Sequence, residues 1–350
     1  MSIQRLARQI VFSLLFFSYG IQAVEGYQEE DCYWKPTLWE GFNIELKGSY
    51  LYWGVQEDQL GFAIEGLKLF QLTPTSSTGK LKTHQPKWDS GFRIETGFSN
   101  DCMPISCRLG WTYFQTHSIA HSETRQPGDF FSAVTTATTT SFGIGFPYLV
   151  SKSATSKWNI TLNEYAFDLD YAFSCAPCIS FHSYLGVLGV QIDQKQQIAY
   201  NSIPNGQDLI DLEVTRKNNF WGVGPRLGLG VNWQLLDWLA VVGNASSAFV
   251  FGKFDVKNSF FAPPELADHL SHVHAKSWRG RPMVSGSLGF EWKDCLTDSI
   301  GFSLGVLYEF QYWWQQWHSS SNVQDCLLSG EGRWGDLSLQ GLVISAAVTF

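Results

Sequence analysis

Residues 299–315 read SIGFSLGVLYEFQYWWQ, and this stretch decides the fold of the 350-residue chain. Every even position from Ile300 to Trp314 is apolar, eight residues in all, whereas the odd positions are mostly Gly, Ser, Glu and Gln. Period two places successive side chains on opposite faces of a β-strand. A run of this length exceeds the ~5–6 residues of an average soluble strand. We therefore predict a long strand with one apolar face.

The same alternation recurs along the chain. It is clear in 41–54, 165–173 and 218–234, whereas it is poor in 179–200 and changes phase near Asn163. The polar face holds Gly, Ser, Asn and isolated charges, which is typical of transmembrane barrels. We predict eleven strands, at 41–54, 59–72, 88–99, 105–118, 158–173, 179–200, 218–234, 237–254, 271–292, 298–317 and 338–350.

The gaps between these strands alternate in length. The long gaps are 73–87, 119–157, 201–217, 255–270 and 318–337, and the short ones are 55–58, 100–104, 174–178, 235–236 and 293–297. Outer-membrane barrels have long extracellular loops and short periplasmic turns, and bacterial barrels have an even strand number. The sequence therefore predicts an all-β fold, a transmembrane antiparallel β-barrel of about 12 strands (range roughly 10–16). A twelfth strand would lie in 27–40 or 119–157, and 119–157 could instead be a long loop that constricts the lumen.

Composition excludes several classes of protein. Charged residues are 16% of the chain, against about 25% on average, and aromatic residues are 15%. This is too apolar for a disordered chain. Asp and Glu outnumber Lys and Arg by 32 to 24, which argues against a nucleic-acid partner. A mean hydropathy of -0.09 and the lack of long apolar runs argue against a helical membrane bundle.

The N-terminus resembles a secretory signal peptide over residues 1–23. Arg5 and Arg8 precede an apolar stretch, 10–21, which is short for a membrane span, and Ala23 fits the cleavage site. Residues 24–40 would then be a periplasmic segment or a first strand, and 41–350 the barrel domain. We predict a protein exported to the bacterial outer membrane, with outer-membrane lipid as a partner.

Aromatic residues and the chain end support a barrel. One set of tryptophans lies near predicted short turns (Trp53, Trp233, Trp238 and Trp292), and another near predicted long loops (Trp88, Trp158, Trp221, Trp278, Trp314 and Trp317). Two such sets resemble the aromatic girdles at the membrane interfaces. The last strand ends on Phe350, which resembles the terminal signal that the barrel assembly machinery recognises.

Four phrases carry a family resemblance: GSYLYW at 48–53, NFWGVGPRLG at 219–228, YEFQYWW at 308–314 and DLSLQG at 336–341. Together they resemble the pore-forming major outer membrane protein family of Legionella and chlamydia-like bacteria, over roughly residues 41–350. The resemblance implies a porin that lets small hydrophilic solutes and ions diffuse through it, with an adhesive surface role as an addition. It implies no catalytic residues, so we expect neither enzymatic activity nor a cofactor.

The polar phase of the strands supplies the candidate pore-lining residues. They are Glu45, Lys47, Arg93, Glu95, Arg108, Asp168, Asp170, Arg226, Glu309 and Gln311. Charged side chains on a pore wall tune ion selectivity, although the same residues could form ion pairs that only brace the wall. Two other functions stay open: a plugged barrel that acts as a structural protein or adhesin, and a secreted carbohydrate-binding β-sandwich. No metal-binding pattern stands out.

The seven cysteines suggest a different role. Cys102, Cys175, Cys178 and Cys295 fall in predicted short turns, and Cys107 lies just inside the next strand. The exported compartment permits disulfides, so these thiols could crosslink the barrel to envelope proteins or to another copy. The alternative is a local bridge between Cys102 and Cys107. The spacing Cys175-Ala-Pro-Cys178 is that of a redox motif, but it lies in a turn rather than at a helix N-terminus.

Overall fold

The computed structural model confirms an all-β barrel. It describes residues 42–67, 80–100, 103–123, 130–133, 150–151, 153–176, 178–205, 208–261, 272–297, 300–319 and 333–350. Within this part of the chain ten antiparallel strands form one closed barrel, at the low end of the predicted range. They are β1 (Phe42–Glu57), β4 (Lys87–Asn100), β5 (Met103–Glu123), β8 (Ser153–Ala176), β9 (Ile179–Asn205), β10 (Asp208–Leu236), β11 (Leu239–Phe261), β12 (His272–Thr297), β13 (Ile300–Ser319) and β14 (Arg333–Thr349).

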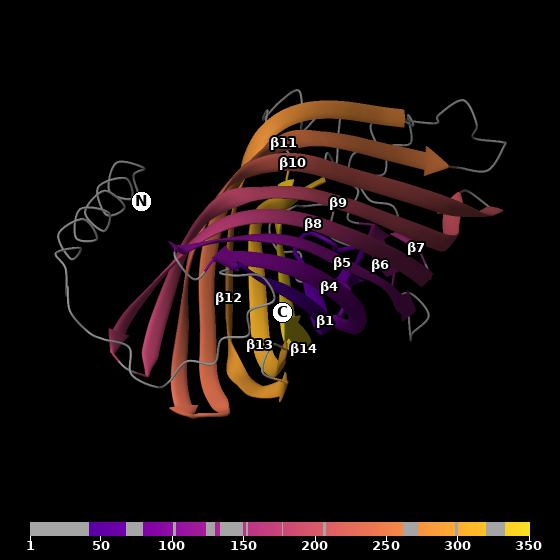
Figure 1. Cartoon of the computed structure of the whole chain (residues 1–350). Coiled ribbons are helices and arrows are strands. Elements are labelled where there is room, and N and C mark those ends of the chain that lie inside the picture. Colours follow the sequence, from indigo (N-terminus) through magenta and orange to yellow (C-terminus); the bar gives the residue numbers. More distant parts are fainter. Residues whose placement is uncertain are drawn as a thin grey trace. The chain divides into compact units, whose positions relative to one another are not determined.

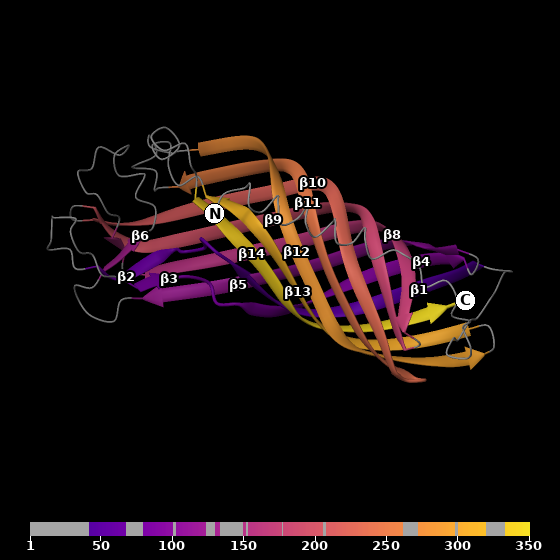
Figure 2. The ribbon, with the colours of Figure 1, turned by 90° about the vertical axis from the view of Figure 1, so that its left-hand side faces the viewer.

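The barrel closes where the first and last strands meet. The order around the ring is β1-β14-β13-β12-β11-β10-β9-β8-β5-β4, and β1 pairs with both β14 and β4. Phe350 donates its backbone N–H to the Ile44 carbonyl over 2.9 Å, and Ile44 donates to the Phe350 carbonyl over 3.1 Å. Figure 1 and Figure 2 show the yellow C-terminal strand beside the indigo β1. A closed ring leaves no unpaired edge in lipid, and it rules out the β-sandwich.

The two ends of the barrel differ in their connections. At the turn end, β4–β5, β8–β9, β10–β11 and β12–β13 are joined through 101–102, 177–178, 237–238 and 298–299, as the short gaps predict. The predicted turn at 55–58 is wrong, because β1 runs on to Glu57 and its chain emerges at the opposite, loop end. The predicted strand 59–72 is also wrong as a barrel strand. Its described residues, 59–67, hold only β2 (Ala63–Leu67), in a small sheet with β3 (Lys80–Lys82), β6 (Phe130–Ala133) and β7 (Val150–Ser151).

Along strand β8 the outward face changes from apolar to polar, and the inward face changes from polar to mostly apolar. Near the turn end its outward residues are apolar, from Tyr165 to Phe173, while Asp168 and Asp170 face inward. Beyond Asn163 the outward residues are polar, whereas the inward ones are buried and, apart from Ser156, apolar. The inward phase itself never changes. The apparent phase change near Asn163 is therefore a change of environment on both sides of one regular strand.

Strand β9 repeats this exchange, which explains its poor alternation in the sequence. Leu185 and Val187 point outward and are exposed, whereas farther along the same face carries Gln191, Asp193 and Lys195. The opposite face continues as buried side chains up to Tyr200. We call the part with an apolar outer face the turn half of the barrel, and the part with a polar outer face the loop half.

The apolar outer band has the height of a membrane. On β10 it runs from Trp221 to Trp233, both about half exposed. Twelve residue steps of about 3.3 Å, tilted by about 40°, span roughly 30 Å, close to the ~25 Å band of outer-membrane barrels. Trp233 and Trp238 lie at the turn end of this band, while Trp221 and Trp278 lie at its other margin. These four fit the predicted girdles.

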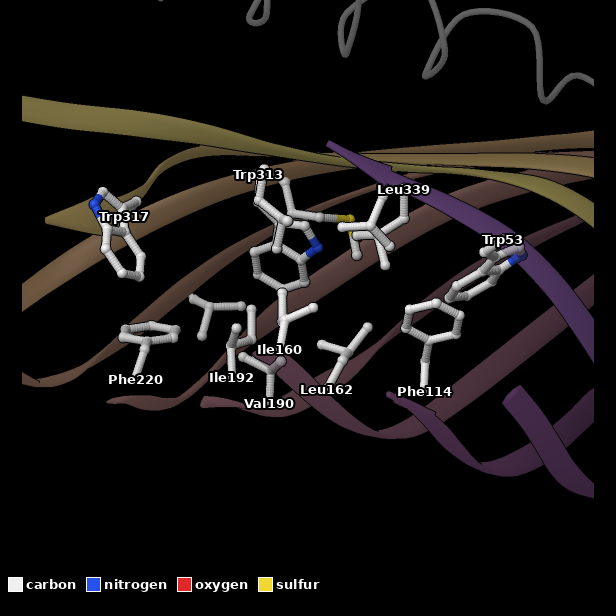
Figure 3. Close-up of a cluster of buried hydrophobic side chains, with 14 of the residues drawn as sticks. Trp53, Phe114, Ile160, Leu162, Val190, Ile192, Phe220, Trp313, Trp317 and Leu339 are labelled. Atoms are coloured by element: carbon white, nitrogen blue, oxygen red, sulfur yellow. The ribbon is translucent and has the colours of Figure 1, made fainter. Parts of the chain in front are cut away.

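Three predicted girdle residues lie elsewhere. Trp53, Trp158 and Trp317 are at most 2% exposed and point into the barrel. They belong to an apolar cluster that fills the loop half, to which every barrel strand except β4 contributes. Figure 3 shows Trp53 and Trp313 facing Phe114 and Ile160 across the interior. The sequence misled here because an inward tryptophan and a lipid-facing one look alike.

The segment after β1 folds into the loop end of the barrel. Leu60 and Phe62 are 1% exposed, and their carbonyls accept hydrogen bonds from Gln196 Nε2 over 3.1 Å and from the Tyr200 hydroxyl over 2.6 Å. His84, farther along this segment, lies between Ser118 and Ser156 at 3.1 and 2.8 Å. Residues 58–67 and 80–86 therefore lie at the mouth of the barrel, a role that the sequence suggested only for 119–157. The middle of 119–157 carries β6 and β7, and most of it lies outside the described residues.

One seam interrupts the wall in the loop half. The ladder between β12 and β13 begins at Met283 and Trp313, so 272–282 of β12 pair only with β11 within the described chain. The β13–β14 register shifts between Trp313 and Trp317, where Gln315 adopts a φ of 54°. Gln316 is 1% exposed, and its carbonyl accepts a hydrogen bond from Asn218 on β10. The outer part of β13 thus leans into the lumen. Among the described residues, no helix has the length and hydropathy to cross a membrane.

Candidate functional site: a charged chamber in the turn half

All ten predicted wall residues line one cavity of about 390 Å³ in the turn half. They are Glu45 and Lys47 on β1, Arg93 and Glu95 on β4, Arg108 on β5, Asp168 and Asp170 on β8, Arg226 on β10, and Glu309 and Gln311 on β13. The alternation of each strand places them inward, since the neighbouring residues face lipid. We call this cavity the charged chamber. Whether its wall conducts ions stays a prediction.

Arg93 makes three hydrogen bonds in the chamber. Its Nη1 and Nη2 donate to the two carboxylate oxygens of Glu309 over 3.0 and 2.8 Å, and its Nε donates to Thr112 over 2.9 Å. Strands β1 and β14 separate β4 from β13, so this pair spans a chord of the barrel. The bidentate geometry fixes the planar guanidinium. Arg93 therefore also braces the wall, which is the alternative that the sequence left open.

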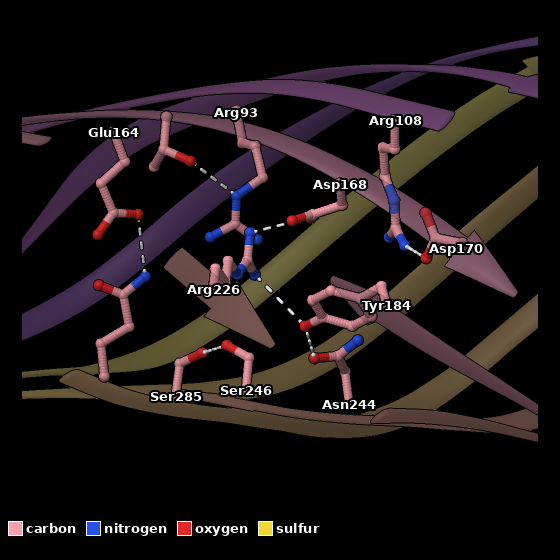
Figure 4. Close-up of polar contacts among 12 residues, drawn as sticks. Arg93, Arg108, Glu164, Asp168, Asp170, Tyr184, Arg226, Asn244, Ser246 and Ser285 are labelled. Atoms are coloured by element: carbon pink, nitrogen blue, oxygen red, sulfur yellow. Dashed lines mark hydrogen bonds and ion pairs between the residues drawn. The ribbon is translucent and has the colours of Figure 1, made fainter. Parts of the chain in front are cut away.

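A second group of contacts joins the four neighbouring strands β8, β9, β10 and β11. Arg226 Nη1 donates to Asp168 over 3.1 Å, and its Nη2 reaches the Tyr184 hydroxyl at 3.5 Å. That hydroxyl donates to Asn244 Oδ1 over 2.8 Å. The guanidinium of Arg226 also lies 5.3 Å from the centre of the Tyr184 ring. Figure 4 shows this network inside the barrel.

The remaining charges are arranged around Glu95. Arg108 forms an ion pair with Asp170, and Lys47 lies opposite Glu95 in the β1–β4 register. Lys47, Arg93 and Arg108 all act electrostatically on Glu95. Positive and negative groups are therefore interleaved around the chamber, and it is not divided into one cationic and one anionic side.

A hydrogen bond across the barrel separates the chamber from the apolar cluster. Gln311 on β13 donates to Glu164 on β8 over 3.2 Å. These strands are five positions apart in the ring of ten, so they lie on opposite walls. Directly beyond Glu164 on the inward face of β8 comes Leu162, which is fully buried. The bridge marks the end of the polar lining.

Sequence analysis missed several chamber residues. Glu164, Tyr184 and His182 also line the cavity, as do Ser285 and Asn244. Tyr184 and His182 lie in 179–200, where alternation was judged poor. The even positions of β9 face inward throughout, so applying this alternation to 179–200 identifies both residues. Ser285 accepts or donates a 2.7 Å hydrogen bond with Ser246, and a serine pair gives no signal in a single sequence.

The cysteines and the terminal phenylalanine lie at the turn end. Cys107, Cys175, Cys178 and Cys295 carry free thiols, so the spacing 175–178 forms no bridge within the chain. Cys102 lies outside the described residues, as does the predicted signal peptide. The role of Phe350 in assembly also stays a prediction. Among the described residues, no group of three or more His, Cys, Asp or Glu side chains could hold a metal ion.

Comparison with known proteins gives one strong match. Residues 36–350 match the family described as Legionella pneumophila major outer membrane protein precursor. A search of curated proteins gives no match. Solved structures with a similar strand arrangement include the outer membrane protease OmpT from Escherichia coli, at 9% identity and a TM-score of 0.40, covering 92% of this chain and 99% of that one.

Two further structures have lower scores. A major outer membrane protein from Thermus thermophilus has 8% identity and a TM-score of 0.31, over 88% of this chain and 99% of that one. A Pseudomonas aeruginosa FadL homologue has 10% identity and a TM-score of 0.26, over 89% and 90%. Similarities this low carry no conclusion about activity or ligand.

Proposed function

Because this chain belongs to the Legionella pneumophila major outer membrane protein family, we propose that it is a narrow outer-membrane pore for small hydrophilic solutes and ions. The charged chamber is the selective segment of this pore, and the apolar cluster above it is the gate. One observation carries the proposal: ten polar and charged side chains from six strands surround a single cavity inside a closed, lipid-facing barrel. The proposal assigns no catalytic step to the protein.

The gate follows from the loop half. Trp313 and Trp317 are fully buried inside the barrel, and Gln311 bridges to Glu164 directly below them. Water leaves a narrow apolar constriction readily, and hydrophobic constrictions gate channels by this dewetting. Conduction therefore requires the apolar cluster to loosen, and we expect brief, small current steps rather than a wide, permanently open pore.

A second candidate function rests on the same contacts. If the apolar cluster never opens, the protein is a closed barrel that acts as a structural protein or adhesin. The full burial of Trp313 and Trp317 favours this candidate, since loosening a packed core costs free energy. Leu60, Phe62 and His84, which are buried at the mouth, would then close it permanently.

Planar-bilayer recordings of the refolded protein separate the two candidates. A pore gives discrete current steps, and Gln311→Ala, which removes the bridge to Glu164, raises their frequency. Ser303→Ala serves as the matched control, because Ser303 bonds Glu291 near the turn end, away from this bridge. Correctly folded protein that gives no current with either variant supports the closed barrel and contradicts the pore.

The partners are proposed on separate grounds. Cys175, Cys178 and Cys295 are exposed at the turn end, which lies in the periplasm if the long loops face outward. From there they can crosslink to envelope proteins or to a second copy. Non-reducing gels of isolated envelopes should show a disulfide-linked ladder that collapses with reductant. A single monomer band under both conditions contradicts the crosslinking.

A further inference from the structure

Arg281 is a buried cation that has no counter-charge among the residues that the structure describes. It lies on the inward face of β12, two residues before Met283, and is 4% exposed. Its Nη1 reaches Gln315 Oε1 at 3.2 Å and the Gly280 carbonyl at 3.4 Å, whereas its Nε and Nη2 have no hydrogen-bond partner in the described part of the chain. A buried guanidinium is ordinarily neutralised by a carboxylate or a phosphate. Two free donors at one buried cation point to a missing anion.

A second cation lies beside the first. Arg279 shares the inward phase of β12 but is exposed. The Arg279 and Arg281 guanidiniums lie 4.9 and 4.2 Å from the centre of the Trp334 ring. His318 stacks on the same ring at 4.1 Å. In the part of the chain that the structure describes, neither arginine has an ion pair, so two positive charges lie against one indole.

The seam in the wall gives access to these groups. Strand β13 leaves β12 at Met283, so it no longer covers Arg279. Trp278, on the outward face next to Arg279, is 55% exposed and marks the margin of the apolar band, where membrane proteins place tryptophan at headgroup level. The two arginines therefore lie at the depth of lipid headgroups, on the part of β12 that pairs with β11 but not with β13 among the described residues.

We infer that Arg279 and Arg281 form a binding site for a phosphate-type anion at the seam between β12 and β13. A tetrahedral oxyanion accepts the free Nε and Nη2 hydrogens of Arg281 while Arg279 covers its outer side. The anion is either free phosphate or the phosphomonoester headgroup of a lipid in the facing leaflet. This inference does not depend on conduction, since a closed barrel has the same seam.

The variant Arg281→Met tests the inference through the direction in which it shifts the midpoint of thermal unfolding. In phosphate-free detergent it removes an unpaired buried charge, so its midpoint of thermal unfolding should equal or exceed that of the wild type. Added inorganic phosphate should raise the midpoint of the wild type and leave that of Arg281→Met unchanged. Lys276→Gln is the matched control, because Lys276 is a nearby cation on the outward face that pairs with Asp255; it should respond to phosphate as the wild type does.

Direct binding identifies the source of the anion. We expect the refolded protein to bind radiolabelled inorganic phosphate, with at least a tenfold loss of affinity in the double variant Arg279→Gln/Arg281→Met. Stabilisation in phosphatidylcholine vesicles that contain phosphatidic acid, without binding of free phosphate, identifies a lipid headgroup instead. The inference is overturned if neither probe acts, or if either acts equally on the wild type and the double variant.

Discussion

The turn half and the loop half of this barrel are built from the same strands with the same inward phase, yet they are inside out relative to each other. In the turn half apolar residues such as Phe167 face lipid and Asp168 faces a polar chamber. In the loop half Lys157 faces outward and Trp158 packs inside. The period of a strand fixes which side chains share a face. The medium on each side then determines their polarity. One continuous sheet therefore has an apolar outer face in the turn half and an apolar inner face in the loop half.

The two halves should also differ in what they contribute to stability. The loop half buries large apolar side chains, and each contributes roughly 1.5–3 kcal/mol. The turn half holds ion pairs inside, where the cost of removing the charges from water offsets much of their attraction. We therefore expect variants inside the loop half to have the largest effects on folding, and variants in the chamber wall to act mainly on selectivity.

Trp313→Ala should have the largest effect. Trp313 is fully buried in the centre of the apolar cluster, and truncating such a residue costs about 3–5 kcal/mol. Urea titrations of the protein in lipid vesicles measure this loss. In bilayers the same variant should pass larger currents if the cluster is the gate.

The neighbouring Trp314→Ala is the matched control for this variant. Trp314 points outward and is 39% exposed, so it belongs to the lipid boundary and not to the cluster. Its loss should leave the current unchanged and cost less folding free energy. Equal effects of Trp313→Ala and Trp314→Ala would mean that the loop half has no packed interior.

Charge on the lipid face should have the next largest effect. Leu304→Arg places a cation in the apolar outer band and should cost about 2–4 kcal/mol near the midplane. Ser303→Arg points into the lumen and should leave folding nearly intact. On β8 the same outward face should respond differently with depth: Phe167→Arg is costly, whereas Thr161→Arg lies in the loop half and is tolerated. Equal refolding of all four variants in lipid would contradict the assignment of faces.

The sequence predicted the lipid face well and the loop half poorly, for one physical reason. Alternation shows which residues share a face, and in the turn half the apolar face is always the lipid face. In the loop half the apolar face points inward, so Leu60 and Phe62 suggested a barrel strand although they pack inside the mouth. In the loop half, which has a polar outer face like a soluble protein, an apolar face therefore marks the interior of the barrel and not the lipid.

His84 offers a smaller, pH-dependent test of the loop half. It lies outside the barrel strands, and its burial lowers the pKa to about 4 from the ordinary value near 6.5. Below about pH 6.5 the undocked segment binds a proton that the docked one excludes, so docking weakens as the pH falls toward about 4. The slope approaches 1.4 kcal/mol per pH unit. Protection factors of the amides in 58–67 and 80–86, which correct for the slower intrinsic exchange in acid, should fall between pH 7 and pH 4.5.

The variant His84→Gln keeps hydrogen-bonding capacity toward Ser118 and Ser156 without a titrating group. The protection factors of the segment should then be much less sensitive to pH over this interval. If the variant and the wild type show the same pH dependence, another group controls the docking of the segment.

The candidate site illustrates a second limit of sequence analysis. Each chamber residue could be found from the phase of its own strand, but its partner could not. Arg93 and Glu309 are 216 positions apart, and their contact depends on the order and register of four strands. The bridge from Gln311 to Glu164 likewise follows only once the ring is closed with ten strands.

The chamber arginines should change selectivity with the smallest effect on folding. Lysine and arginine supply four cations to the chamber lining, against seven carboxylates, a formal charge of -3. Replacing Arg93, Arg108 and Arg226 by Gln leaves one cation and a formal charge of -6. Reversal potentials in a salt gradient should therefore shift toward cation selectivity.

The double variant Arg226→Gln/Asp168→Asn separates wall charge from the loss of an ion pair. It removes the 3.1 Å ion pair between these side chains but keeps the formal charge of the lining, since one cation and one carboxylate disappear together. Its reversal potential should match that of the wild type, although the contact is gone. A shift as large as that of the triple Gln variant would mean that the ion pairs shape the passage sterically. If neither variant changes the reversal potential of a conducting protein, ions do not pass through the charged chamber, and the wall residues only brace the barrel.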